Sequence, residues 1–306
     1  MSKKSYFGVN GVARNVKSWP FGVGGVARSV KCGYFGVSGV ARQFLNGFEL
    51  NNVDWATIRA VSDASQGANY WSVGDTKSIT INGKAGNFTF SNYTVDAFII
   101  GFNHNSAKEG SNRIHFLIGK SGGKLVGLCD GSYDSPVSST GYFSMNSSDT
   151  NSGGWNASQM RKTLLGNNGT PSSPTANTLL AALPSDLRSV MKSVTKYTDN
   201  TGNNSNVSGN VTATSDYLFL LAEFEVQGSR SYANQYEQNS QAQYDYFKAG
   251  NSKIAYRHTA TGTAVWWWLR SALYDSSYAF CRVYTDGSAN TSYAHYSAGV
   301  LPGFAV

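Results

Sequence analysis

The sequence predicts an α+β protein in which short antiparallel strands outnumber helices. Segments of alternating apolar and polar residues recur along the chain, and only a few stretches have the apolar spacing of a helix. The two kinds of segment do not alternate regularly, which argues against a parallel doubly wound sheet. Gly, Ser, Asn, Thr and Tyr are abundant and charged residues are only 14% of the chain. This composition is typical of a strand- and loop-rich protein that works outside a cell.

Residues 1–48 contain a threefold repeat, which we call the repeat arm. The segment Phe7–Arg14 recurs as Phe21–Arg28 and Phe35–Arg42, with Gly-Val-x-Gly-Val-Ala between the end residues. We expect each unit to form two short strands joined by a glycine turn. Units this short cannot bury a core alone, so they must pack on each other or on another surface. Two alternatives follow for the arm. It either attaches the protein to a partner or makes it an oligomer, for instance a trimer, or it is a locally ordered mobile extension.

The net charge of +7 comes from the repeat arm. The arm has seven basic residues (25 − 18) and no acidic residue, whereas 18 basic residues balance 18 acidic residues elsewhere. Because the basic residues are evenly spaced and not clustered, we do not expect nucleic-acid binding. Three cysteines without a C-x-x-C spacing predict neither a disulfide scaffold nor a zinc site. No apolar run approaches the roughly 18 residues of a membrane helix, and the N-terminus does not resemble a signal peptide. We therefore expect no cofactor, no metal and no membrane insertion.

Residues 49–306 form the predicted α+β body. It begins with a helix over about 53–64, because Asn51 to Asp54 offer capping side chains and apolar residues then follow helical spacing. Hairpins and strands come next: 77–90 with a turn at Asn82-Gly83, a central strand at 95–102, and a hairpin of 113–118 with 124–128. Further helices are predicted at 159–165, 177–183 and 186–195, a strand at 217–226, and a partly helical segment at 235–249.

From Trp266 onward the sequence predicts short strands alternating with loops. Alternation in Trp266–Leu269 would place Trp267 and Leu269 on one face and Trp266 and Trp268 on the other. We expect these side chains to form core, and the alternative is a stacking platform for a sugar ring. Arg270 is expected to be buried and held by backbone carbonyls or an acidic side chain. Asp286-Gly287 is most simply a turn.

Three sequence blocks near the C-terminus carry a resemblance. They are Trp-Leu-Arg-Ser (Trp268–Ser271), Phe280–Ser288 ending in Thr-Asp-Gly-Ser, and Gly299–Phe304. With the hydrophobic segment Leu218–Val226 and the repeat arm, they resemble an uncharacterised domain family common in phages and bacteria. The layout is also similar to the variable proteins of diversity-generating retroelements, which have a C-type-lectin-like fold. The Gly-Gly-Ser-Trp block common in that fold is absent here.

The resemblance implies a phage receptor-binding protein that is made in the host cytoplasm and carried on the virion tail. Its partners would be a host cell-surface protein or glycan, and other tail proteins through the repeat arm. In retroelement variable proteins the C-terminal segment changes at template adenines, and the residues between the blocks are types reachable from an Asn codon. Tyr with Ser, Asn and Arg is also the composition of a protein-binding surface. We therefore predict twelve display residues: Leu273, Tyr274, Asp275, Ser277, Tyr278, Arg282, Tyr284, Thr291, Ser292, Tyr293, His295 and Tyr296.

Catalytic signals are weak, and we do not expect an enzyme. A metal or acid–base cluster can be drawn from His104, His115, Asp96 and Glu109, but their spacing matches no zinc motif. No Gly-x-Ser-x-Gly elbow is present. Glu223 and Glu225 on one strand would lie about 7 Å apart and suggest a glycosidase pair, although we expect them to organise arginine side chains. The alternative functions are a glycan-active hydrolase of a phage tail and a structural tail component.

Overall fold

The computed structural model describes the strands between Tyr6 and Gln43 and residues 49–128, 143–202, 205–258 and 260–306. The chain divides into two compact units, Met1–Asp54 and Trp55–Val306. The division falls after the short 3-10 helix η1 (Leu50–Asn52), somewhat beyond the boundary expected after residue 48. Cys32 and Cys129 lie outside the described residues, and Cys281 is buried and unpaired.

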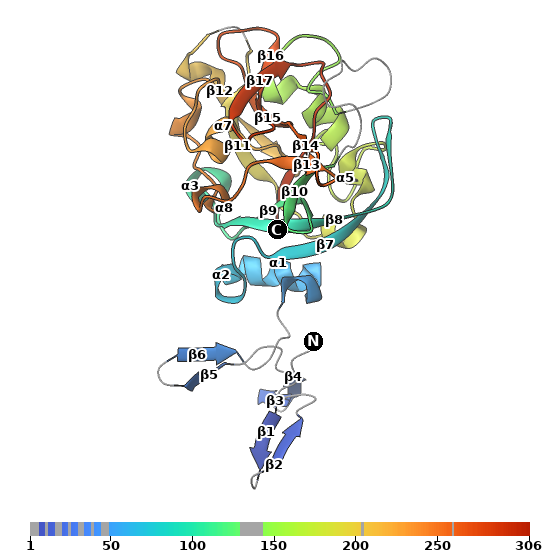
Figure 1. The fold of residues 1–306 in the computed structure, drawn as a ribbon, viewed down its shortest axis with the longest axis vertical. Coiled ribbons are helices and arrows are strands. Elements are labelled where there is room, and N and C mark those ends of the chain that lie inside the picture. The colour runs from blue at the N-terminus through green and yellow to red at the C-terminus, as the bar shows by residue number, and fades with distance from the viewer. Residues whose placement is uncertain are drawn as a thin grey trace. The chain divides into compact units, whose positions relative to one another are not determined.

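The N-terminal unit contains three hairpins of identical register, one for each repeat (Figure 1). The strand pairs are β1 (Tyr6–Val9) with β2 (Val12–Asn15), β3 (Pro20–Val23) with β4 (Val26–Ser29), and β5 (Tyr34–Val37) with β6 (Val40–Gln43). In each hairpin the phenylalanine that opens the repeat pairs with the arginine that ends it, as Phe7 does with Arg14. The prediction of two short strands for each unit is confirmed.

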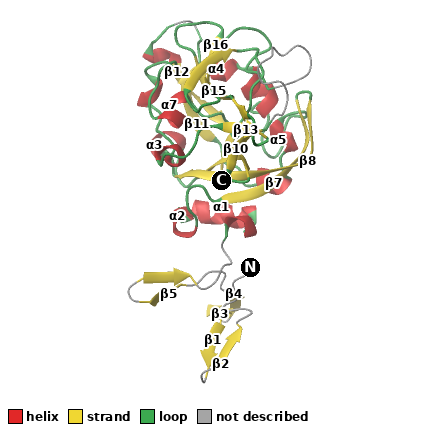
Figure 2. Ribbon diagram, in the orientation of Figure 1, coloured by secondary structure: helices red, strands yellow, loops and turns green. Residues whose placement is uncertain are grey.

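The second unit is an α+β body whose largest sheet has seven strands, flanked by short helices (Figure 2). Six strands follow the order β14 (Ala264–Val265), β13 (Ala255–Arg257), β10 (Lys124–Gly127), β9 (Ile114–Ser121), β8 (Phe88–Phe102) and β7 (Thr76–Ala85), and β18 (Gly303–Ala305) pairs with β9. Three helices accompany this sheet: α1 (Trp55–Asp63), α2 (Gly67–Tyr70) and α3 (Ser106–Glu109). The predicted opening helix and the hairpin of β9 with β10 are confirmed.

The C-terminal strand β18 joins this sheet by pairing with β9. Phe304 on β18 stacks on Phe116 of β9 with ring centroids 5.1 Å apart, and Trp55 of α1 lies edge-on against both rings. At Gly303, an added Cβ would lie 2.4 Å from the ring of Phe219, so only glycine fits there. The beginning and end of the second unit therefore share one core.

The first hairpin turns later than the sequence suggested. We expected the turn at Asn82-Gly83, but β7 continues to Ala85 and the chain turns at Gly86-Asn87. Asn82-Gly83 instead lies at a register shift within the ladder, where Gly83 has a positive φ of 127°. An Asn-Gly pair favours positive φ in a bulge as well as in a turn, and the longer ladder pairs more backbone groups.

Two smaller sheets and several short helices complete the body. The two-stranded sheet is β11 (Val194–Asp199) with β12 (Val211–Asp216), and the three-stranded sheet has the order β15 (Trp267–Ala272), β16 (Ala279–Val283) and β17 (Ala289–Tyr293). The helical elements are α4 (Gly154–Ala157), the π-helix η2 (Met160–Leu165), α5 (Leu179–Ala182), α6 (Ser185–Arg188), η3 (Ser208–Asn210), α7 (Glu223–Gln227), η4 (Glu237–Asn239) and α8 (Asp245–Lys248). None of the helices in the described part of the chain has the length and apolar character to cross a bilayer.

Two predicted elements are wrong. The helix expected over 186–195 ends at Arg188, and Val194 already begins a strand because alternate β11 side chains enter the core. The strand expected over 217–226 is a buried extended segment followed by helix α7. Helix α7 begins at Glu223 because the Glu225 carboxylate accepts a hydrogen bond from the Ala222 N–H at 2.9 Å, which satisfies a free donor at the helix start.

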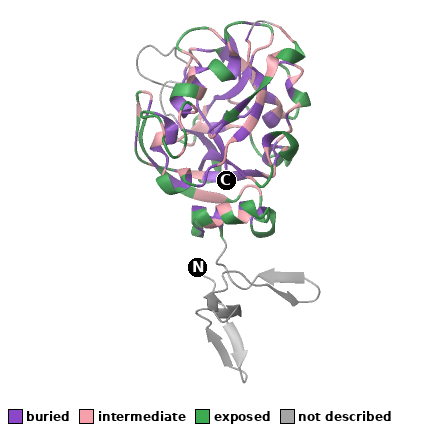
Figure 3. Ribbon diagram, turned by 180° about the vertical axis from the view of Figure 1, so that it is seen from behind, coloured by how far each residue is buried: buried purple, intermediate pink, exposed green. Residues whose placement is uncertain are grey.

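The tryptophan run lies in the core. Trp266, just before β15, and Trp267, Trp268 and Leu269 on β15 are all buried. Figure 3 shows that buried residues fill the interior of the body. The indole N–H groups of Trp267 and Trp268 donate to the backbone carbonyls of Lys253 and Phe143. The expected core packing is confirmed, and these rings are not accessible as a platform for a sugar.

Buried charges next to the tryptophans form what we call the Arg270 cluster, namely Arg270, Glu225, Lys196, Glu109 and Tyr244. The Arg270 guanidinium donates to both Glu225 carboxylate oxygens, at 2.5 and 2.8 Å, and to the Leu220 carbonyl at 2.8 Å. The Lys196 ammonium lies 3.1 Å from Glu225, 2.8 Å from Glu109 and 2.8 Å from the Tyr244 hydroxyl. Burial of Arg270 between a carbonyl and an acid is confirmed. The two cations hold the pKa of Glu225 below its usual range, against the effect of burial, which is to raise it.

Glu225→Gln should destabilise the body strongly, because it leaves Arg270 and Lys196 buried without their shared counter-charge. Breaking a buried ion pair in this way costs about 3–5 kcal/mol. The measurement is the free energy of unfolding in urea. Glu49→Gln is the matched control, since Glu49 is exposed and the other four glutamates of the chain are buried. Equal stability of the two variants would contradict a structural role for the cluster.

Glu237 should make the stability of the body depend on pH. Burial raises the pKa of its carboxyl to about 7, above the unfolded value, so the folded state holds the proton more tightly. The resulting stabilisation is present below about pH 4.5 and is lost as the pH rises through 7. Relative to Glu237→Gln, the wild type should lose about 2–3 kcal/mol of unfolding free energy between pH 5 and pH 8. Parallel unfolding curves at the two pH values test this, and a constant difference would contradict it.

Candidate functional site

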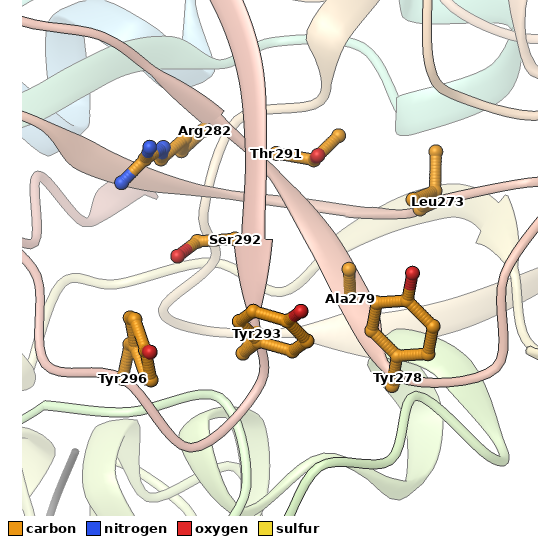
Figure 4. Close-up of a pocket in the computed structure, with 8 residues that line it drawn as sticks. All are labelled: Leu273, Tyr278, Ala279, Arg282, Thr291, Ser292, Tyr293 and Tyr296. Carbon is orange, nitrogen blue, oxygen red and sulfur yellow. The ribbon is translucent and has the colours of Figure 1, made fainter.

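The three-stranded sheet and the turns beside it form a hollow of about 390 Å³ on the surface of the body (Figure 4). Eight residues line it: Leu273, Tyr278, Ala279, Arg282, Thr291, Ser292, Tyr293 and Tyr296. Seven of these are predicted display residues, and Ala279 also belongs to the residue types reachable from an Asn codon. The volume lies in the range of ligand sites in proteins. Residues from four segments of the C-terminal sequence therefore meet at one place.

Tyrosine rings form a row along the hollow. Tyr278 and Tyr293 are 45% and 44% exposed, and their rings stack with centroids 5.1 Å apart. The ring of Tyr296 lies 5.4 Å from that of Tyr293, and His295 is 4.9 Å from Tyr296. In Figure 4 the three tyrosines lie side by side at the rim. Tyrosine rings stacked in this way offer a large contact area, and few side-chain torsions lose their freedom when a ligand binds.

Arg282 supplies the positive charge of the hollow. Its guanidinium lies 4.2 Å from the ring centre of Trp266 and 5.1 Å from that of Tyr284, which places the cation against two aromatic rings. Its Nε donates to the Asn290 side-chain oxygen at 3.2 Å. The lining residues include no acid, histidine or cysteine. The hollow thus has hydrogen-bonding and stacking groups and one cation, but no nucleophile–base pair for covalent chemistry.

A tight turn holds β16 and β17 in register. The Tyr284 N–H donates to the Ser288 carbonyl at 2.8 Å, and the Gly287 N–H donates back to Tyr284. Gly287 has a φ of 88°, and the Asp286 carboxylate accepts from both the N–H and the hydroxyl of Ser288. The Ser288 hydroxyl and N–H lower the pKa of the exposed Asp286. The turn predicted at Asp286-Gly287 is confirmed.

Asn151 fixes the loop that carries Tyr278, and sequence reasoning missed it. Its side-chain amide donates to the carbonyls of Leu273, Ser276 and Ala279 at 3.3, 2.7 and 2.9 Å. Its backbone N–H donates to the carbonyl of Ser277 at 2.8 Å. Asn151 lies in a Ser-, Asn- and Gly-rich stretch, so nothing local distinguishes it from its neighbours.

The remaining predicted display residues lie around the hollow without lining it. Asp275 and Ser277 are exposed on the loop after β15, and the Tyr274 ring faces Arg230 at 5.7 Å. His295 contacts the carboxylate of Asp149, another residue that the sequence did not single out. The ring of Tyr284 lies 5.1 Å from the Arg282 guanidinium and does not line the hollow. Of the display residues that do line it, Ser292 is only 9% exposed. Ser292 therefore offers its hydroxyl at the base of the hollow and little outward surface.

The acid–histidine cluster weighed from the sequence is partly assembled, but inside the protein. His104, Glu109 and Glu225 place potential ligand atoms within 4.8 Å of one another, and they are the described residues that come closest to a metal site. The Lys196 ammonium already contacts both carboxylates there. Burial lowers the pKa of His104 to about 3 and that of His115 well below its usual value, so both imidazoles stay neutral. Asp96 is not part of the cluster, because its carboxyl interacts with Ser78 and Lys120.

The glycosidase pair is contradicted by the geometry. Glu223 and Glu225 lie on helix α7 and not on a strand, and both are buried. The Glu223 carboxylate accepts hydrogen bonds from the backbone N–H groups of Ser231, Tyr232 and Ala233. Glu225 organises Arg270, as expected, whereas Glu223 organises a backbone loop.

Asn151→Ala should loosen the loop between β15 and β16, which carries Tyr278, while leaving the fold intact. The carbonyls of Leu273 and Ser276 lose their side-chain donor and the carbonyl of Ala279 loses one of its two donors, which should cost about 1–3 kcal/mol of unfolding free energy. Amide exchange at Leu273, whose N–H donates to the Ala279 carbonyl, should become faster than in the wild type. Asn156→Ala, at an exposed position on α4, is the control and should exchange like the wild type. Unchanged exchange in Asn151→Ala would show that other contacts hold the loop.

Residues 139–306 match a family that is described as a domain of unknown function, DUF6273. No curated protein and no solved structure matches the chain. The match includes the three-stranded sheet, the hollow and all twelve predicted display residues. Since it spans more than half of the chain, the protein belongs to the DUF6273 family.

Proposed function

We propose that this protein is a receptor-binding protein of a phage tail, and that its Tyr-rich hollow contacts a ligand on the host-cell surface. One observation carries the proposal. Residues selected from the sequence because of their type converge on one surface hollow, where they supply seven of the eight lining side chains. Side chains that merely filled space would be buried, whereas Tyr278, Tyr284 and Tyr293 are among the exposed large apolar residues of the described chain.

The proposed mechanism is display on a rigid support. The Trp266–Leu269 core and the Arg270 cluster hold β15, and β16 and β17 follow from it in one antiparallel ladder. The exposed tyrosines would then already have a fixed conformation before a ligand binds, which reduces the entropic cost of association. A host-surface protein or glycan would meet stacked rings, hydroxyls and the Arg282 guanidinium.

A C-type-lectin-like fold is part of the proposal. Two features support it: the C-terminal strand β18 returns to the main sheet beside β9, and a separate small sheet carries the candidate site near the C-terminus. The proposed role of the repeat arm is to mount the protein on other tail proteins or to form an oligomer. Several copies on one particle would raise the apparent affinity of a weak single site through effective concentration.

The burial of Glu223 and Glu225 argues against the glycosidase alternative, for which they were the candidate catalytic pair. Backbone N–H groups bind the Glu223 carboxylate, and Arg270 binds that of Glu225. A structural tail component would not need exposed, mutually stacked tyrosines around a hollow. Binding therefore accounts for more of the geometry than either alternative.

The test is binding of the labelled full chain to a panel of bacterial cells and to a glycan array. The triple variant Tyr278→Ala, Tyr293→Ala and Tyr296→Ala should lose at least about tenfold in affinity, or about 1.4 kcal/mol. Its matched control is Tyr70→Ala, because Tyr70 is 42% exposed on α2 and lies outside the hollow. Thermal unfolding confirms that both variants are folded. If the triple variant binds every target as well as the control does, the site assignment is wrong.

A further inference from the structure

The hollow follows the outer edge of a sheet. β17 is the last strand in the order β15-β16-β17. Thr291, Ser292 and Tyr293 are consecutive on β17, and all three line the hollow. Because successive side chains of a strand point to opposite faces, the hollow touches both faces of the sheet at this edge. Figure 4 shows β17 crossing in front of β16, with Arg282 and Tyr296 on one side and Leu273 and Tyr278 on the other.

The backbone of β17 has hydrogen-bonding capacity on this edge. The Ala294 N–H donates to Tyr278 and the Tyr284 N–H to Ser288, at the two ends of the β16–β17 ladder. Since hydrogen-bonded pairs alternate in an antiparallel ladder, Ala289, Thr291 and Tyr293 point their N–H and C=O groups outward.

Part of this outward edge is already engaged. The Thr291 N–H donates to the Asn290 side chain, and the Tyr293 carbonyl accepts from the Tyr296 N–H. Within the described residues, the Ala289 N–H and C=O, the Thr291 C=O and the Tyr293 N–H have no partner.

Two other sheet edges of the body are protected, whereas the described residues show no such protection along β17. The free edge of β7 carries Lys77 and Lys84 and a register shift, which are common devices against unwanted strand pairing. The opposite edge of the three-stranded sheet is covered, since Trp268 and Arg270 donate backbone N–H groups to Gly299 and Leu221. The sequence of β17, Ala-Asn-Thr-Ser-Tyr, contains no charge and no proline.

We propose that the ligand of this site is an extended protein segment that adds to β17 as a fourth strand. The inference rests on the proposed binding function and names the class of partner. Main-chain hydrogen bonds to the β17 edge would provide affinity, and alternate side chains of the added strand would provide specificity. One set of side chains meets the stacked rings of Tyr278 and Tyr293, and the other meets Arg282 and Tyr296. Since Arg282 is the one charged residue of the lining, the segment should alternate apolar or aromatic residues with an acidic one.

The experiment selects displayed random peptides of about ten residues, long enough for one strand, on the full-length protein. Peptides that bind the wild type but not Tyr293→Ala are kept. Their affinities are then measured for Ala289→Pro and Ala289→Val, because Ala289 lies on the β17 edge without lining the hollow. Proline removes the outward N–H of residue 289 and places a ring on the outer edge, while the β16 ladder bonds of Asn290 and Ser292 remain. Valine keeps the backbone edge and is the matched control.

We expect Ala289→Pro to weaken binding by about tenfold or more, while Ala289→Val binds like the wild type. A second measurement does not depend on the folding of any variant. Peptides N-methylated at every other residue should lose binding to the wild-type protein in one of the two phases and keep it in the other.

Three results would overturn the inference. In the first, Tyr293-dependent peptides bind both variants equally and tolerate N-methylation in both phases. In the second, no such peptide is selected although cells or glycans bind in a Tyr-dependent manner, which leaves the proposed function intact and makes the ligand a glycan or a folded surface. In the third, the protein forms a dimer that Ala289→Pro abolishes, so that a second copy occupies the edge. Loss of all tyrosine dependence would instead remove the proposed function itself.

Discussion

The guanidinium of Arg270 is the group on which the rest of the body depends. It is fully buried, so every donor must find a partner inside the protein. Its partners come from two other segments of the chain: Thr198 on β11, and the stretch from Leu220 to Glu225 in which helix α7 begins. A cation on β15 thereby fixes the second sheet, the buried extended segment and a helix start against one another.

The Trp266–Leu269 core and the Arg270 cluster form a buried frame, and this frame sets the geometry of the candidate site. β15 lies in the core on both faces, and β16 and β17 extend from it toward the surface in one ladder. Side chains near β15 are therefore constrained by packing, while those on the outer strand and its turns are free of that constraint. This separation explains how one short stretch of sequence can contain both fully buried and exposed aromatic residues.

Patterns with a local physical cause could be predicted from the sequence. The hairpin of each repeat, helix α1, the β9–β10 hairpin and the turn at Asp286-Gly287 follow from periodicity and turn chemistry. Features set by distant partners could not. Leu218–Val226 has the apolar content of a strand. In the structure, however, the Glu225 carboxylate pairs with Arg270 and also accepts a hydrogen bond from the Ala222 N–H, and this second bond favours a helix from Glu223 onward. Asn151 resembles its polar neighbours in sequence, and only the fold places it against the carbonyls of the loop between β15 and β16. In the same way, His104 and Glu225 come together only in the folded chain. Residue type alone indicated the tyrosine set, while the sheet edge that it surrounds required the structure.

The most direct test of the division between frame and display surface is a complete substitution scan of residues 266–306 in the full chain. Each variant is read twice, once for the amount of folded protein and once for capture by bacterial cells that bind the wild type. Substitutions at Trp266–Ser271 should abolish folding, and those at Tyr278, Tyr293 and Tyr296 should spare folding but abolish capture. If the tyrosines proved as intolerant for folding as the tryptophans, or if capture survived their replacement, the surface would be part of the frame and the central claim would be wrong.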